Sequence, residues 1–379
     1  MKKICFVITS RAQYARNKLL LRLLNSDPDF DLKIILGGSA VLPKYGTVLS
    51  DLKKEGFDSV EELYVNIEGG NNISMAKTTG LSIFEFTNTF QRIKPEMVIV
   101  AGDRFEVLAA ATAAAYMNIV VVHIEGGDVS GTIDESVRHA VTKLSHIHFT
   151  TNDVSKGRLL RMGEDPDYVH NVGSLDVEFL NHVPDVSDLS FVNQVGVGAK
   201  IDLSQPFIVV IQHPVTTGEN NLKNMQATLD AVHGLDVQAV WFWPNADAGE
   251  SDMSRVLRTF RESYNDYNIR FITNLSAEEF INLLKRASCL AGNSSAGIKE
   301  CSYLGVPVVN IGSRQQNRMA AENVVNTSYD TQAIKEAVLR QMNHGAYPRS
   351  QIYAQEDTSK KIVEILKKAQ PPIQKRFFD

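Results

Sequence analysis

The feature that most constrains the fold is the stretch from Met97 to Phe149, in which short apolar runs alternate with a helical segment. The runs Met97–Ala101 and Ile119–His123 are rich in valine and isoleucine, as are parallel strands that are buried on both faces. An alanine-rich segment joins them and is typical of a helix. This strand–helix–strand unit predicts a doubly wound α/β sheet.

The same alternation continues through the whole chain of 379 residues, a length that suggests two domains. We expect a doubly wound domain over residues 1–174 and a second one over residues 175–357, with a turn-rich connection at His182–Pro206. The amphipathic segment Thr358–Ala369, within residues 358–379, is expected to pack back on the first domain. The expected strands are Ile4–Thr9, Leu32–Leu36, Met97–Ala101, Ile119–His123, His146–Thr150, Phe207–Ile211, Gln238–Phe242, Ile269–Thr273, Cys289–Ala291 and Val306–Ile311.

The composition excludes several classes of protein. Hydrophobic residues make up 44% of the chain, enough for sizeable cores, and the formal net charge is −5 without a long basic run. Nucleic acid and anionic membrane surfaces are therefore not expected partners. The apolar runs are too short to cross a membrane. Cys5, Cys289 and Cys301 are expected to be reduced core residues of a cytoplasmic protein. No metal or cofactor is expected, because no Cys/His cluster with metal-ligand spacing occurs.

Acidic residues follow two successive expected strands, where ligands bind in doubly wound sheets. Asp103 and Arg104 follow the first of these strands, and Glu125 follows the second beside two glycines. Asp134 and His139 lie in the next helix. Carboxylates that share a cleft have shifted pKa values, which suits them to proton transfer. Each also has a plainer interpretation, since Asp103 and Asp134 are good helix caps.

Other segments are suited to binding phosphate. Arg11 lies at the turn from the first strand to the first helix, where backbone N–H groups and a guanidinium can hold an anion. The small-residue loop 292–297 contains Ser294 and Ser295 and precedes Glu300, which could accept hydrogen bonds from a ribose. The loop lacks the lysine of an ATPase-type P-loop. Arg314, after the last strand, is expected at the same cleft, with a surface loop as the alternative.

Two further polar residues end strands of the second domain. His213 follows the strand Phe207–Ile211, and Asn245 follows the strand Gln238–Phe242. A histidine that faces a cleft can bind phosphate or shuttle protons, although a lone histidine is often structural. Asn245 could equally belong to an ordinary polar loop. Both are candidate ligands of the same substrate.

Together these segments resemble the UDP-N-acetylglucosamine 2-epimerase family, and most of all its hydrolysing branch, which starts sialic acid synthesis. The resemblance spans Ile4 to Asn323 and is carried by GDRFE, HIEGGDVSGTIDESVRHAVTKLSHIH, QHPVTT, PNADAG, GNSSAGIKE and GSRQQNR. It implies two Rossmann-like domains arranged as in GT-B glycosyltransferases, with the active site in the interdomain cleft. It also implies that UDP-GlcNAc and water give ManNAc and UDP, through elimination of UDP to 2-acetamidoglucal and then hydration with inversion at C2.

The resemblance also implies roles for single residues. Asp103, Glu125 and Asp134 correspond to the catalytic acids. The residues expected to hold UDP are Arg11, His213, Asn245, Ser294, Ser295, Glu300 and Arg314. Arg104 and His139 are expected at the sugar site. A homodimer or homotetramer is expected from the behaviour of the family.

Two departures from the family pattern bear on the sugar. Position 13 is Gln where relatives often carry an acid, and the loop Gly37–Ala40 lacks the histidine that is common there. A hydrolysing enzyme for UDP-2,4-diacetamido-2,4,6-trideoxyhexose, of the legionaminic acid pathway, is therefore an alternative. Less favoured alternatives are a non-hydrolysing epimerase, a GT-B glycosyltransferase and a nucleotide-sugar sensor.

Overall fold

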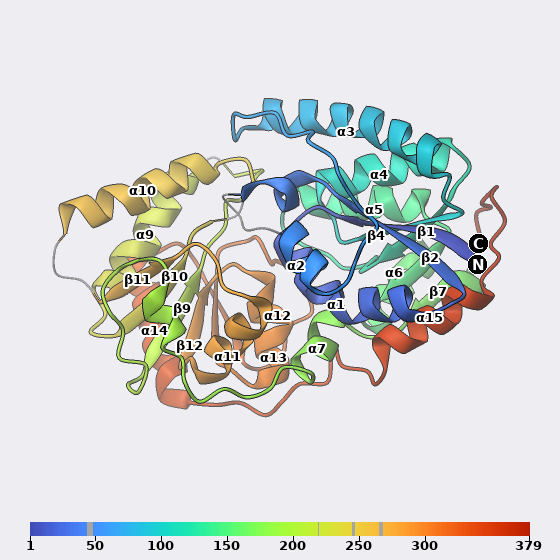
Figure 1. Cartoon of the computed structure of the whole chain (residues 1–379). Helices are drawn as coiled ribbons and strands as arrows, with labels where there is room; N and C mark the ends of the chain where they lie inside the picture. Colours follow the sequence, from blue (N-terminus) through green and yellow to red (C-terminus); the bar gives the residue numbers. More distant parts are fainter. Residues whose placement is uncertain (44–47, 219, 245–246, 265–267) are drawn as a thin grey trace.

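The computed structural model describes residues 1–43, 48–218, 220–244, 247–264 and 268–379. Asn245 lies outside the described residues. Two sheets of parallel strands, the second with one antiparallel edge strand, are each flanked by helices and lie next to one another (Figure 1). The class predicted from strand–helix alternation is confirmed, with two doubly wound α/β units.

The first sheet has seven parallel strands in the order β3-β2-β1-β4-β5-β6-β7. Strand order reverses between β1 and β4, so the loops that follow these two strands diverge and leave a crevice. The bounds are β1 Lys2–Ile8, β2 Phe30–Leu36, β3 Val60–Glu62, β4 Met97–Ala101, β5 Val120–Ile124, β6 Ile147–Thr150 and β7 Val169–Asn171.

Both faces of this sheet are buried under helices. Because side chains alternate along a strand, Phe6 of β1 packs toward one face, with Leu20 and Ile362, while Val7 packs toward the other, with Phe86. Ile362 belongs to α15, which therefore shares the core of the first sheet, as expected for the C-terminal segment. The helices are α1 Arg11–Ser26, α2 Val48–Lys54, α3 Asn72–Ile93, α4 Phe105–Tyr116, α5 Ile133–Leu144, α6 Asp153–Arg161 and α15 Thr358–Lys368, with 3-10 turns η1 Gly38–Val41 and η3 Pro166–Tyr168.

The second sheet has the order β14-β13-β12-β9-β10-β11-β8. Its strands are parallel except β8, which pairs antiparallel with β11. The order reverses between β12 and β9. The bounds are β8 Val197–Gly198, β9 Phe207–Ile211, β10 Gln238–Phe242, β11 Ile269–Ile272, β12 Cys289–Gly292, β13 Val308–Ile311 and β14 Val324–Thr327. The helices are α8 Phe191–Gln194, α9 Asn221–His233, α10 Glu250–Ser263, α11 Ala277–Arg286, α12 Ser295–Ile298, α13 Glu300–Leu304 and α14 Thr331–His344.

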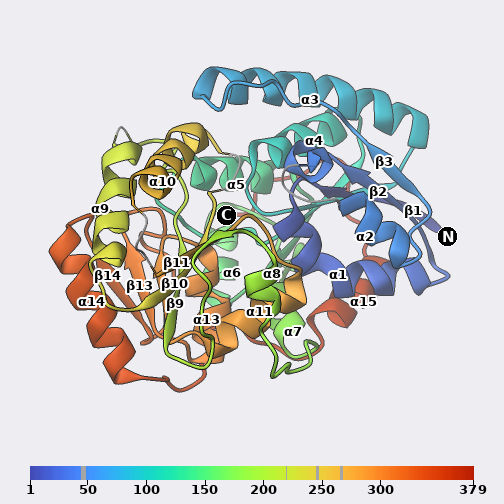
Figure 2. The ribbon, with the colours of Figure 1, turned by 60° about the vertical axis from the view of Figure 1, so that its left-hand side comes forward.

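The chain passes between the two units through helix α7, Leu175–Leu180, whose residues are all buried. Figure 2 shows α7 below α1, close to α11 and α13. The expected irregular connection at His182–Pro206 is wrong in part, because it contains α8 and the edge strand β8. The edge strands β3, β7, β8 and β14 were not predicted from the sequence. The domain limits at residues 174 and 357 stay predictions.

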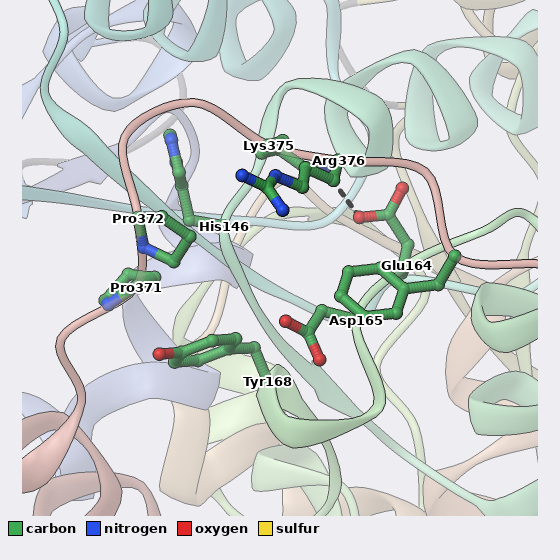
Figure 3. Close-up of a pocket in the computed structure, with 9 residues that line it drawn as sticks. His146, Glu164, Asp165, Tyr168, Pro371, Pro372, Lys375 and Arg376 are labelled. Carbon is green, nitrogen blue, oxygen red and sulfur yellow. Dashed lines mark hydrogen bonds and ion pairs between the residues drawn. The ribbon is translucent and has the colours of Figure 1, made fainter.

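The last residues form a tail that lies along the first unit. Lys375 and the prolines Pro371 and Pro372 surround a small cavity of about 50 Å³, opposite Glu164 and Tyr168 (Figure 3). Lys375 donates from its Nζ to Glu164 Oε2 at 2.5 Å. The tail is thereby tied to the loop between α6 and η3 of the first unit. Within the described residues, no helix has the length and apolar character that crossing a membrane requires.

The three cysteines are free and buried, as expected.

Candidate functional site

A cleft of about 360 Å³ lies where the carboxyl ends of the two sheets meet. Its first wall includes Ser10 and Asp103, which follow β1 and β4 on either side of the reversal point of the first sheet. Its second wall includes His213 and Ser294, which follow β9 and β12 at the reversal point of the second sheet. The two crevices that doubly wound sheets form by topology are thus joined into one site.

The turn after β1 is fixed by local hydrogen bonds. The Ser10 hydroxyl accepts from the backbone N–H of Gln13 at 3.2 Å and caps α1. The Gln13 side chain donates to the carbonyl of Ala101 at 2.7 Å and accepts from the backbone N–H of Thr9 at 2.5 Å. Gln13 therefore links the end of β1 to the end of β4 through hydrogen bonds. Arg11, two residues earlier, lines the cleft.

The residues after β4 are held by opposite charges. Asp103 Oδ2 accepts from the buried guanidinium of Arg138, which also donates to the carbonyl of Asp128 at 2.9 Å. Arg104 binds Glu106 with two of its nitrogens, at 3.0 and 3.1 Å. Its third nitrogen, Nη1, reaches across the cleft to Asp247 Oδ1 at 2.9 Å. Asp103 remains partly exposed to the cleft, with 29% of its side chain accessible.

Asp134 sits in the first turn of α5, where Thr132 is the helix cap. The Thr132 hydroxyl donates to Asp134 Oδ2 at 2.8 Å. Burial raises the pKa of Asp134 above its ordinary value, and the neighbouring charge of Asp247 acts in the same direction. The hydrogen bond and the charges of Arg314 and Arg104 act against these effects. A carboxyl group with a raised pKa that lines a cleft is suited to giving and taking a proton.

Glu125 follows β5 and adopts a left-handed backbone conformation, with φ +70°. Such a conformation is unusual for a residue other than glycine and is often found at functional sites. Its carboxylate accepts from Lys299 Nζ at 2.6 Å and from Arg16 Nη1 at 3.2 Å. Burial by itself would raise the pKa of Glu125, but these two cations outweigh burial and lower the pKa to about 2. Glu125 is therefore an anion in this arrangement.

On the opposite wall, the loop after β12 holds the loop after β9. Asn293 accepts from the backbone N–H of His213 at 2.7 Å and donates to its carbonyl at 2.9 Å. Burial lowers the pKa of His213 to about 3, and the charge of Arg314 acts in the same direction. The imidazole is therefore neutral near pH 7. Ser294 caps the short helix α12, with its hydroxyl accepting from Ala296 at 3.3 Å.

Glu300 begins α13 and lines the cleft. Burial, together with the nearby charge of Asp176, raises its pKa to about 7. In the part of the chain that the structure describes, no hydrogen-bond partner is found for its Oε2 atom. The aromatic rings of Trp243 and Phe280 line the same side of the cleft, where a planar base could stack. This wall therefore combines anion-binding, hydroxyl-binding and stacking groups.

The structure brings most of the sequence-predicted residues to one cleft. Those that line it are Asp103, Glu125, Asp134, Arg11, Arg104, His213, Ser294, Ser295, Glu300 and Arg314. His139 is not among the lining residues; its Nε2 lies 3.9 Å from Glu135 on the same helix, and its neighbour Arg138 reaches the site instead. Asn245 lies outside the described residues, so its expected role stays a prediction.

Sequence reasoning indicated Asp247, which ends the same strand as Asn245 and lines the cleft, but it missed the charged residues Arg16 and Lys299. Arg16 lies in the second turn of α1, a position that could have placed it near the cleft end of that helix. Lys299 is adjacent to Glu300 in a segment already recognised as a binding loop. Neither pattern indicates which carboxylate each cation contacts. Among the described residues, no group of three or more His, Cys, Asp or Glu side chains is arranged to hold a metal.

The fold and the site together define a two-domain α/β enzyme of GT-B-like architecture. The family model for UDP-N-acetylglucosamine 2-epimerase matches residues 22–367, and the chain belongs to this family. A UDP-N,N'-diacetylbacillosamine 2-epimerase (hydrolyzing) of Legionella pneumophila is 34% identical over 371 residues, covering 97% of this chain and 96% of that protein. A UDP-N-acetylglucosamine 2-epimerase of Neisseria meningitidis is 31% identical over 396 residues, covering 100% of this chain and 99% of that protein.

Solved structures show the same fold. The UDP-GlcNAc 2-epimerase of Methanocaldococcus jannaschii, in complex with UDP-GlcNAc and UDP, aligns with a TM-score of 0.81. The alignment covers 96% of this chain and 99% of that one at 18% sequence identity. At this identity the likeness concerns the fold, and it confirms the expected pair of Rossmann-like units.

Proposed function

We propose that this protein is a hydrolysing 2-epimerase that acts on a UDP-linked 2-acetamido sugar. The observation that carries the proposal is one cleft in which Asp103 and Asp134 face a wall of anion-binding and stacking groups. UDP would lie along the second wall, with phosphates near Ser294 and Arg314 and a ribose hydroxyl at Glu300. The sugar would then extend toward the acids of the first wall.

The chemistry requires two proton transfers and a departing diphosphate. One carboxylate removes the proton at C2 while the bond from C1 to the UDP oxygen breaks, which leaves a glycal and UDP. Water then adds at C1, and a proton returns to C2 from the opposite face, so the free sugar is inverted at C2. Asp134, whose pKa is raised, is suited to one of these transfers. Arg314 offsets the charge that builds on the diphosphate.

Two sugars are candidates. UDP-GlcNAc would give ManNAc, the starting compound of sialic acid synthesis. UDP-2,4-diacetamido-2,4,6-trideoxyhexose is the second candidate, and the Legionella pneumophila relative bears the name of an enzyme for such a sugar. Met75 and Phe105 line the first wall and offer apolar surface that suits a 6-methyl group better than a hydroxymethyl group.

The test is to incubate the protein with each UDP-sugar in D₂O and to follow the products by proton NMR. Release of UDP together with a free sugar that is inverted and deuterated at C2 supports the proposal. Accumulation of an inverted UDP-sugar would instead indicate reversible epimerisation.

D134N and D103N are expected to reduce turnover by roughly 10²–10⁴-fold while UDP still binds, because only proton transfer is lost. Unchanged turnover in both variants would contradict the assigned roles.

A further inference from the structure

A buried cluster of four charges connects the two units below the cleft. Lys299 Nζ lies 2.6 Å from Glu125 Oε1 and 3.3 Å from Asp176 Oδ2. Arg16 completes the cluster, at 3.2 Å from Glu125 Oε2 and 3.1 Å from Asp176 Oδ1. Cations and carboxylates alternate, so each carboxylate contacts both cations. Lys299 has 1% of its side chain exposed, and Glu125 has 7%.

The four residues come from different parts of the fold. Glu125 follows β5 and Arg16 lies on α1, both in the first unit. Asp176 lies on the connecting helix α7. Lys299 lies between α12 and α13 in the second unit. Arg16 and Glu125 would therefore stay together if the units moved apart, whereas Lys299 would leave Glu125.

We propose that Lys299 is a positioning residue that holds Glu125 ionised and correctly oriented when the two domains are closed. This inference rests on the proposed function, since it concerns a carboxylate expected to take part in the reaction. Lys299 acts through Glu125 and is not itself assigned to the substrate. Domain closure thereby becomes a condition for the active form of Glu125.

The electrostatic surroundings of Glu125 support this role. The charged and titratable groups that interact with Glu125 are Lys299, Arg16, Asp128, Arg318 and Tyr353. Arg318, from the second unit, also binds Asp128 at 3.1 Å. After burial itself, Lys299 has the largest effect on the pKa of Glu125. Without Lys299, burial and the charge of Asp128 would be opposed only by Arg16 and Arg318, so the pKa of Glu125 would rise.

The backbone of Glu125 points to the same conclusion. A left-handed conformation in a residue other than glycine persists when surrounding contacts hold it in place. Lys299 of the second unit donates to one carboxylate oxygen of Glu125, and Arg16 of the first unit donates to the other. Buried ion pairs contribute little net stability but can specify one arrangement of the chain. The contact between Lys299 and Glu125 therefore fixes the orientation of the carboxylate, and loss of Lys299 would leave Glu125 and Asp176 sharing Arg16.

The experiment compares K299M, K299Q and K299R with the wild-type protein. In K299M and K299Q, kcat is expected to fall by roughly 10²-fold or more, while KM and the affinity for UDP change only a few-fold. The acid limb of the kcat profile is expected to move to higher pH, because Glu125 must lose its proton without the help of Lys299. K299R, which keeps the charge, is expected to restore most of the activity.

K18Q is the matched control. Lys18 pairs with Glu278 at 2.8 Å and with Glu55 at 2.7 Å and also joins the two units, but neither carboxylate lines the cleft. Its loss should leave kcat and the pH profile unchanged. An unshifted acid limb together with wild-type kcat in K299M and K299Q would overturn the proposal, and so would failure of K299R to restore activity in folded protein.

A readout without turnover separates this inference from the proposed function. Small-angle scattering of the wild type and K299Q, each with and without UDP, reports domain closure directly. K299Q is expected to remain more open with UDP bound. If the wild type hydrolyses neither UDP-sugar, the proposed function fails, yet this comparison still decides the role of Lys299. Equal closure in the two proteins would overturn that role.

Discussion

Arg104 and Asp247 form an ion pair across the cleft, with 2.9 Å between Arg104 Nη1 and Asp247 Oδ1. The charge of Asp247 also raises the pKa of Asp134. D247N should therefore lower the pKa of Asp134 and move the corresponding limb of the kcat profile to lower pH. The expected shift is up to about one pH unit, the size of a single charge interaction near a protein surface.

The control for this change is D252N in α10, the helix that follows Asp247, where Asp252 pairs with Arg255 and both are largely exposed. That variant should leave the profile in place. Arg104 keeps both contacts with Glu106 in D247N, so the fold should be retained. Movement of the limb to higher pH would contradict the prediction.

Gly131 of the first unit contacts the loop of the second unit that carries Arg314. Its N–H donates to the carbonyl of Arg314 at 3.0 Å, and a Cβ at this position would lie 1.8 Å from the carbonyl oxygen of Ser313. G131A should therefore push apart the two loops that bring Arg314 toward the acids. We expect kcat/KM to fall by roughly 10²-fold, as for misplacements of about 1 Å near reacting groups, with both cores intact.

The matched control is G80A on α3, where a Cβ would meet nothing within 4 Å. Alanine favours a helix interior over glycine by about 0.5–1 kcal/mol, so G80A should be slightly stabilising and fully active. Steady-state kinetics and urea unfolding of both variants provide the check. Normal kinetics in G131A would show that the loops can separate without cost to the reaction.

The C-terminal tail should contribute to stability rather than to activity. Lys375 donates to Glu164 at 2.5 Å and to the last carbonyls of α5, those of Thr142 and Lys143, at 3.2 and 3.0 Å. K375M would remove these bonds, although Glu164 would retain His148 and Lys143. We expect a loss of roughly 1–3 kcal/mol in the free energy of unfolding with unchanged kcat.

Thermal and urea unfolding measure this effect. K368M is a suitable control. The Lys368 side chain is 81% exposed, and its ion pair with Glu364, at 3.8 Å, contributes little to the free energy of unfolding because it lies at the surface. Loss of activity in K375M without loss of stability would show that the tail influences the cleft through α5.

Buried histidines should make the protein less stable in acid. Burial lowers the pKa of His123 to about 3, although its bond to the Gly102 carbonyl, at 2.9 Å, acts in the opposite direction. Between about pH 6.5 and pH 3 the unfolded chain therefore binds a proton that the folded chain does not. Stability is lost as the pH falls through this range, by about 1.4 kcal/mol per pH unit for one such group.

Urea unfolding of the wild type and H123Q at several pH values between 4 and 7 tests this point. H123Q should show a shallower dependence, since one of the contributing groups is gone. Identical slopes would mean that His123 titrates normally in the folded protein.

Much of the architecture follows from local patterns. Ten expected strands coincide with observed ones to within two residues at each end, because valine- and isoleucine-rich runs between helices have few other ways to bury both faces. The edge strands β3 and β8 were missed, since they have three and two residues and are not fully buried. The clustering of Asp103, Arg11 and Ser294 could also be predicted from the sequence, because parallel sheets bring the ends of their strands to one edge.

Which side chains reach the cleft depended on their direction on each helix and on how the two units pack together. Arg138 and His139 are consecutive, but successive residues on a helix point about 100° apart, so only one can face the cleft. One partner of Glu125 is Lys299, which is 174 residues away in the chain. The sequence by itself determined the two α/β units and the strand ends that carry the chemistry. The tertiary structure decided which charges meet and hence which carboxyl groups are ionised, because electrostatic interactions depend on distances and burial that arise when the two units pack together.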